Sequence, residues 1–147
     1  MLIKRSDLKL DKFTMLSCNL SVVPSKKKMS NEELKNVPVD LDFDILTNKS
    51  NSSKIQIMLE IKSNQSENPI PGYMFSVICS ADYNIKALKK MPSEKQGRYI
   101  LFTALPLAIA MVRSQLYYIS SNFPHGHYLL PSIDLPDLFD KKYNKAN

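Results

Sequence analysis

Strict alternation of apolar and polar residues is the feature that most constrains the fold of this 147-residue chain. In residues 37–46 every second residue from Val37 to Ile45 is apolar, and three of the residues between them are aspartates. A period of two over this length predicts a strand with one buried and one solvated face. Residues 54–62 repeat the pattern after a polar break. Two such runs joined by a short polar loop predict an antiparallel pair.

Two further segments are predicted to be strands. Residues 73–80 are apolar on both sides, which indicates a central strand, and residues 8–18 alternate but change phase near Asp11, where we expect a bulge or bend. Residues 26–36 between the first two strands carry four lysines and two glutamates, and we expect a solvated loop there.

The second half of the chain has helical spacing. Residues 98–121 have no glycine and carry two apolar stripes, one through Leu107 and Met111 and the other through Val112 and Leu116. A helix that is apolar on two sides must be covered on two sides, and one four-stranded sheet supplies only one cover. Pro106 is expected to kink this helix or to mark the start of its regular part.

A short final helix is predicted over residues 135–143, with Asp134 as its N-cap. Strands followed by helices predict an α+β fold, and the length predicts one domain over residues 1–147.

Composition limits the possible functions. Twenty Lys and Arg against fourteen Asp and Glu give a net charge of +6. Three glycines are too few for a glycine-rich phosphate loop, so no nucleotide cofactor is expected. The segment of residues 1–9 carries charges within its first five residues and lacks the apolar run of a signal peptide. The longest apolar stretch, residues 99–112, is shorter than the roughly 18–20 residues of a bilayer span, so we expect a cytoplasmic protein without membrane insertion.

No catalytic machinery is recognisable in the sequence. His125 and His127 could supply two metal ligands at most, so a polar loop without metal is expected there. No nucleophile lies in a known motif beside a base, and the protein is not expected to be an enzyme. The aspartates at 40, 42 and 44 are expected to keep one strand face soluble.

One basic cluster stands out, and we expect it to be a solvated loop rather than a nucleic-acid track. It consists of Lys86, Lys89, Lys90, Lys95 and Arg98.

The C-terminal third carries motifs that resemble the SecB family of export chaperones. That family has a helix that opens around a proline, a Phe-Pro pair where the helix ends, and a crossover loop with a Pro-x-Ile/Val signature followed by Leu-Phe or Leu-Tyr. The matching residues here are Pro106, Phe123-Pro124, Pro131, Ile133 and Leu138-Phe139. The upstream order of strands is also similar to that of the family.

The resemblance implies an α+β fold: a four-stranded antiparallel sheet followed by a long helix, a crossover loop and a short C-terminal helix. It implies a homotetramer built as a dimer of dimers. It also implies an ATP-independent holdase that binds unfolded polypeptides, either preproteins or an antitoxin, in an apolar groove. The residues that correspond to the groove are Leu41, Phe43, Tyr73, Phe75, Phe123, Leu129, Leu130, Ile133 and Phe139.

The chain departs from the export members of the family in its charge. Ser76 stands where the family has a glutamate, and the net charge is +6, which puts docking of the SecA motor in doubt. SecB-like chaperones of toxin–antitoxin systems fit this charge better. Two other classes stay open: an assembly or adaptor protein with one fixed partner, and a nucleic-acid-binding protein that uses the basic cluster.

The crossover loop has large apolar residues among Pro, Gly and His. Such residues either pack against the rest of the protein or remain available to a partner. We expect that truncating Leu129 and Leu130 together weakens client binding and changes the stability little.

Overall fold

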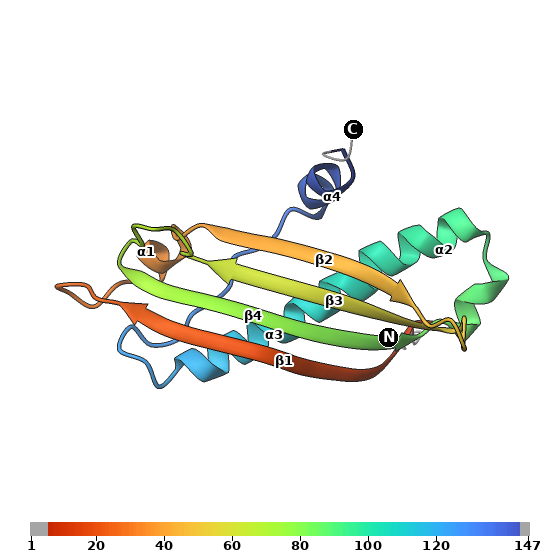
Figure 1. The fold of residues 1–147 in the computed structure, drawn as a ribbon, viewed down its shortest axis with the longest axis horizontal. Coiled ribbons are helices and arrows are strands. Elements are labelled where there is room, and N and C mark those ends of the chain that lie inside the picture. The colour runs from red at the N-terminus through yellow and green to blue at the C-terminus, as the bar shows by residue number, and fades with distance from the viewer. Residues whose placement is uncertain (1–5, 145–147) are drawn as a thin grey trace, which may run out of the picture. The chain divides into compact units, whose positions relative to one another are not determined.

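The computed structural model of the chain describes residues 6–144 and contains four strands and a series of helices. In chain order the elements are β1 (Lys9–Val23), α1 (Asn31–Lys35), β2 (Val39–Thr47), β3 (Lys54–Ser63), β4 (Gly72–Asn84), η1 (Lys86–Lys90), α2 (Ser93–Tyr99), η2 (Ile100–Ala104), α3 (Leu105–Ser120) and α4 (Leu135–Asn144). The strands form one antiparallel sheet in the order β1-β4-β3-β2 (Figure 1). The predicted α+β fold, with its long helix and short C-terminal helix, is therefore confirmed.

The described residues group into two compact units. Unit 1 comprises residues 6–18, 43–60 and 77–112, and unit 2 comprises residues 19–42, 61–76 and 113–144. Every strand of the sheet and α3 continue from one unit into the other.

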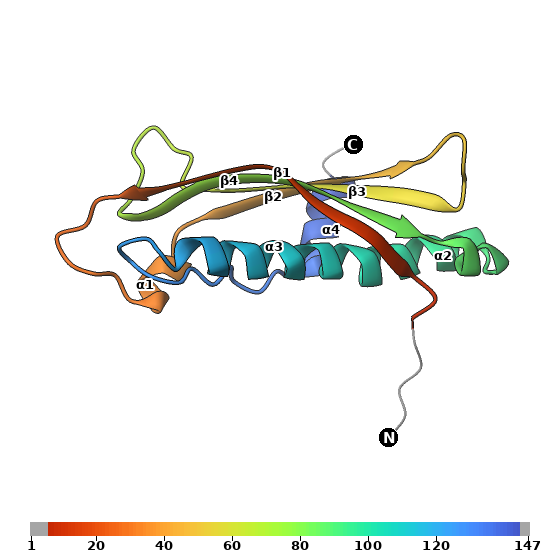
Figure 2. The ribbon, with the colours of Figure 1, turned by 90° about the horizontal axis from the view of Figure 1, so that it is seen from below.

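In both units the core lies between α3 and one face of the strands (Figure 2). The alternation of residues 54–62 predicts this burial correctly: Ile55, Ile57, Leu59 and Ile61 are all at most 3% exposed. In unit 1 the Tyr83 hydroxyl, at the end of β4, donates to the main-chain oxygen of Ala104 at 2.8 Å. Among the described residues, no helix covers the opposite face of the strands (Figure 2).

Pro106 acts at the start of the long helix as predicted. The regular α3 begins at Leu105, and the five residues before it form a π-helical turn. A proline has no N–H to donate to the preceding turn, so the backbone at this point can depart from α-helical geometry at little cost.

The two apolar stripes of the helix have different fates. The stripe through Val112 and Leu116 is fully buried from Leu105 onward. The other stripe divides, since Ile100 and Ala104 are buried whereas Leu107 is 41% exposed. Part of the second stripe thus remains outside the core.

Two predicted loops contain helices instead. The segment 26–36 includes α1, because Ser30 and Glu33 form a capping box that stabilises a short helix. The basic cluster lies on η1 and α2 rather than in a loop, and the helical part of the chain begins at Ser93 rather than at residue 98. The N-terminal prediction, that residues 1–9 lack a signal peptide, falls partly outside the described residues.

By length and composition alone, the helical run Ser93–Ser120 is long and apolar enough to cross a membrane. A core helix of a soluble protein can meet the same criterion. In this fold its residues Leu105, Ala108, Val112 and Leu116 are completely buried against the rest of the chain.

Candidate functional site

A groove of about 420 Å³ in unit 2 separates the start of β2 from α4, and we call it the α1–α4 groove. Its apolar lining consists of Val37, Pro38, Val39, Leu41, Pro131, Ile133 and Leu138. Its polar lining consists of Lys35, Asn36, Asp40, Ser132, Asp134, Asp137 and Lys141. The lining combines apolar side chains with charged and amide groups, so it offers a ligand both apolar contacts and hydrogen bonds.

The end of helix α1, at Lys35, borders the groove beside the start of β2, and the helix is fixed at its own start. The Glu33 N–H donates to the Ser30 hydroxyl at 3.3 Å, and the Ser30 N–H donates to the Glu33 carboxylate at 2.8 Å. The Ser30 N–H and the Ser30 hydroxyl both donate to the Glu33 carboxylate, and together with the Lys27 ammonium they lower the pKa of Glu33 to about 2. Leu34 then packs the helix onto the chain and is 1% exposed.

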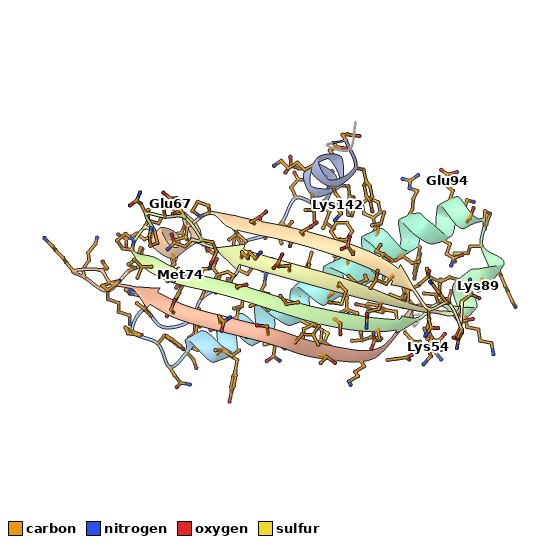
Figure 3. The ribbon with its side chains drawn as sticks, viewed as in Figure 1. Lys54, Glu67, Met74, Lys89, Glu94 and Lys142 are labelled. Carbon is orange, nitrogen blue, oxygen red and sulfur yellow. The ribbon has the colours of Figure 1, made fainter. Side chains whose placement is uncertain are left out.

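Helix α4 forms the opposite wall. The Asp134 carboxylate accepts the N–H of Asp137 at 3.2 Å, so Asp134 is the predicted N-cap. Lys142 of α4 donates to Asp42 of β2 at 2.7 Å, and Figure 3 shows this side chain directed toward the strand. The helix is thus attached to the sheet by a cation of its last turn.

Aromatic packing holds the first half of the crossover loop, residues 121–134, in place. The Tyr73 hydroxyl donates to the main-chain oxygen of Gly126 at 2.6 Å. The Tyr73 ring packs edge-on against Phe123, His125 and Tyr128, at centroid distances of 6.2, 5.6 and 5.9 Å. Burial raises the pKa of Tyr73, which therefore remains a hydrogen-bond donor at neutral pH.

Two polar contacts hold the second half of the loop. The Tyr128 N–H donates to the Ser120 hydroxyl at 2.7 Å, at the end of α3. The Arg113 Nη2 donates to the main-chain oxygen of Pro131 at 2.9 Å. The loop backbone is therefore anchored at both ends before any ligand binds.

Neighbouring leucines of this loop have opposite environments. Leu130 is 1% exposed and belongs to the core, whereas Leu129 is 43% exposed. Both line a small pocket of about 200 Å³, which we call the Arg113 pocket, together with Lys35, Arg113, Pro131 and Ser132. The expectation that the two leucines act alike is thus corrected, because only Leu129 has apolar surface left for a partner.

The structure distributes the predicted groove residues among four environments. Leu41 and Ile133 line the α1–α4 groove, and Leu129 and Leu130 line the Arg113 pocket. Phe123 and Phe139 are half-buried in unit 2. Tyr73 and Phe75 in unit 2 and Phe43 in unit 1 are at most 2% exposed and pack in the core. That any of the nine residues contacts a client stays a prediction.

Sequence reasoning missed several residues of this site, chiefly Lys35, Val37, Arg113 and Leu138. The Ser-x-x-Glu pattern at residues 30–33 is a helix-start signal that could have identified α1 and with it Lys35. Nothing local in the sequence marks Arg113, because its place depends on how the crossover loop returns along α3.

The described residues hold no group of three or more potential metal ligands. His125 is buried beside Tyr73, while the His127 ring stacks on Tyr117 at 4.1 Å, so the two histidines have separate environments. Both cysteines are free, and burial raises the pKa of Cys18 and raises that of Cys79 to about 11. Neither thiol is activated as a nucleophile.

The basic cluster lies in unit 1, where all five of its side chains are exposed on η1 and α2. Figure 3 labels Lys89 and Glu94 in this region. The chain therefore has an exposed cationic surface in unit 1 as well as the groove in unit 2.

Sheet order, long helix, crossover loop and C-terminal helix together define a SecB-like α+β fold. No protein-family model matches the chain, and no curated protein matches its sequence. Among solved structures, the chain is similar to the Mycobacterium tuberculosis SecB-like chaperone Rv1957, solved in complex with a ChAD peptide from the Rv1956 HigA1 antitoxin. The TM-score is 0.54 at 12% sequence identity, over 86% of this chain and 91% of that one.

A second solved structure is a protein of unknown function from Streptococcus agalactiae. It gives a TM-score of 0.46 at 10% identity, over 86% of this chain and 97% of that one. The likeness to the SecB-like chaperone extends over most of both chains, and what it establishes is the fold.

Proposed function

We propose that this protein is an ATP-independent holdase that binds non-native polypeptides in the α1–α4 groove. The observation that carries the proposal is the pairing of an open, partly apolar groove with walls that are already fixed. The loop and the helices are anchored by Tyr73, Arg113 and Lys142, yet Leu129 of the adjoining Arg113 pocket remains 43% exposed. An apolar surface whose backbone is already ordered binds an extended chain without the entropic cost of ordering itself.

The fold neighbour supports a polypeptide as the ligand. That neighbour is a chaperone rather than an enzyme, and its structure contains a peptide of an antitoxin. We therefore propose unfolded chains as clients, with an antitoxin favoured over an exported preprotein. The preference rests on Ser76, which replaces a glutamate of the export chaperones, and on the net charge of +6.

Aggregation assays with unrelated proteins test the holdase function. Two chemically denatured proteins of different sequence are diluted into buffer with and without stoichiometric amounts of this protein, in the absence of ATP. We expect light scattering from both to be suppressed. Suppression of neither, combined with tight binding to one folded partner, would show that the protein is an adaptor.

The exposed basic cluster favours one second candidate, a nucleic-acid-binding protein. Electrostatic binding of this kind falls steeply with salt. If the protein binds a random duplex at low salt, and charge reversal of Lys89 and Lys90 abolishes this while client holding persists, nucleic acid is an additional partner. If client holding is absent and duplex binding is tight, the holdase proposal is wrong.

We propose a homotetramer as the assembled state. Apolar side chains remain exposed on the helical run in each unit: Phe102 and Leu107 are 51% and 41% exposed in unit 1, and Tyr117 and Tyr118 are 44% and 75% exposed in unit 2. Exposed apolar side chains of this size favour association.

Light scattering at micromolar concentration is expected to give four times the chain mass of 16.8 kDa. The change Tyr118→Ser is expected to lower the oligomeric mass, while Tyr143→Ser on α4, at 53% exposure, serves as the matched control. A monomer in the wild-type sample would contradict the proposed assembly.

A further inference from the structure

We propose that the Arg113 pocket binds a carboxylate of the polypeptide held in the α1–α4 groove. This inference rests on the proposed function and adds a recognition element to it. The pocket and the groove are adjacent, because Lys35, Pro131 and Ser132 line both. A chain in the groove can therefore extend into the pocket.

Arg113 offers an unused donor at this point. Its Nη2 is engaged with the main-chain oxygen of Pro131 at 2.9 Å, whereas its Nε is buried and has no hydrogen-bond partner among the described residues. A buried donor without an acceptor is unfavourable, so the guanidinium group gains a hydrogen bond if the side chain shifts to present Nε to a ligand carboxylate. The guanidinium group is planar and matches a carboxylate better than a lysine does.

Lys35 supplies a second positive charge in the same pocket. Its Nζ lies 3.2 Å from the Glu32 carboxylate, but the side chains are 37% and 85% exposed. Surface pairs of this kind contribute little to stability. Lys35 can therefore turn from Glu32 to a bound carboxylate at small cost. Lys35 and Arg113 are the two charged residues in the described lining of the pocket.

The charge of the α1–α4 groove opposes a carboxylate. Apart from the shared Lys35, its lining has three carboxylates, Asp40, Asp134 and Asp137, against the single lysine Lys141. Lys141 is also paired with Asp137 at 2.7 Å. A client carboxylate is repelled along the groove and attracted at its Arg113 end. The difference in charge thus sets the position of a bound segment, with its apolar side chains in the groove.

The carboxylate could come from a client Asp or Glu side chain or from a client C-terminus. Three forms of one unstructured leucine-rich peptide separate these sources. The first has an internal Glu and an amidated C-terminus, the second has Gln in its place with a free C-terminus, and the third has Gln with an amidated C-terminus. Affinities are measured by fluorescence anisotropy with the full chain.

We expect at least one carboxylate peptide to bind about tenfold more tightly than the uncharged amide, in line with hydrogen bonds to charged groups. The peptide that shows the preference identifies the source. The preference is expected to shrink in Lys35→Gln or Arg113→Gln and to stay unchanged in Lys26→Gln, an exposed lysine outside the pocket.

Three results would overturn the inference. Equal binding of all three peptides would remove the carboxylate site and leave the holdase function intact. If the preference for a carboxylate persists in both Lys35→Gln and Arg113→Gln, the pocket is not its cause. If the preference falls equally in Lys26→Gln, it comes from the overall charge of the chain. If none of the peptides binds, the proposed function itself fails, and the carboxylate site fails with it.

Discussion

The change Leu130→Ala is expected to lower the free energy of unfolding by about 2–5 kcal/mol, the usual cost of truncating a buried leucine. Leu130 is 1% exposed and anchors a loop that has no regular secondary structure of its own. Removing its side chain leaves a cavity that the loop backbone, tied by Tyr73 and Arg113, cannot easily close. Chemical denaturation followed by circular dichroism measures the loss.

The neighbouring Leu129→Ala is the matched control for this stability change. It removes the same atoms from a side chain that is 43% exposed, so its effect on unfolding is expected to be small. Equal destabilisation by both changes would mean that Leu129 is also part of the core. The two variants therefore distinguish a side chain packed in the core from an exposed side chain within the same loop.

The double change Leu129→Ser with Ile133→Ser is expected to weaken client binding by roughly thirtyfold. Both side chains are only partly covered by the chain, so a client would bury the remainder. Half of a full aliphatic burial is worth about 1 kcal/mol for each residue, and about 2 kcal/mol corresponds to this loss in affinity. Binding of a fluorescent unfolded client, titrated at constant salt, measures it.

The control for this binding change removes equally exposed leucines from unit 1. Leu16 and Leu46 are 56% and 49% exposed, and neither lines the α1–α4 groove. The variant Leu16→Ser with Leu46→Ser is expected to retain client affinity. If the control loses affinity and the groove variant does not, the clients are held in unit 1 and the groove has another role.

Local pattern is enough to locate the strands of this protein, although β1 and β4 continue beyond the predicted ranges to Val23 and Asn84. In residues 54–62 a period of two places every second side chain on one face, and burial of those side chains follows once that face meets any cover. Asp134 could likewise be recognised as an N-cap, because capping depends on residues within one turn. The Phe-Pro and Leu-Phe motifs predicted the observed fold through their resemblance to the SecB family.

Two sequence patterns were interpreted incompletely, one around α1 and the other in the second apolar stripe of the long helix. The segment around α1 was expected to be a loop from its charges, although Ser30 and Glu33 carry the information for a helix start. The second apolar stripe of the long helix was expected to lie outside the core as a whole. The buried positions Ile100 and Ala104 show that it does so only in part, since the stripe passes through the π-helical turn before Pro106.

The sequence by itself determined the four strands, the long helix and the short C-terminal helix, because hydrophobic period and helix capping act between residues a few positions apart. Only the tertiary structure decided which residues of the crossover loop are pinned and which are free. Leu129 and Leu130 have the same chemistry and adjacent positions, so no local rule separates them. Their difference arises because Tyr73 and Arg113, distant in sequence, hold the loop backbone in one orientation. That orientation turns Leu130 into the core and leaves Leu129 at the mouth of the Arg113 pocket.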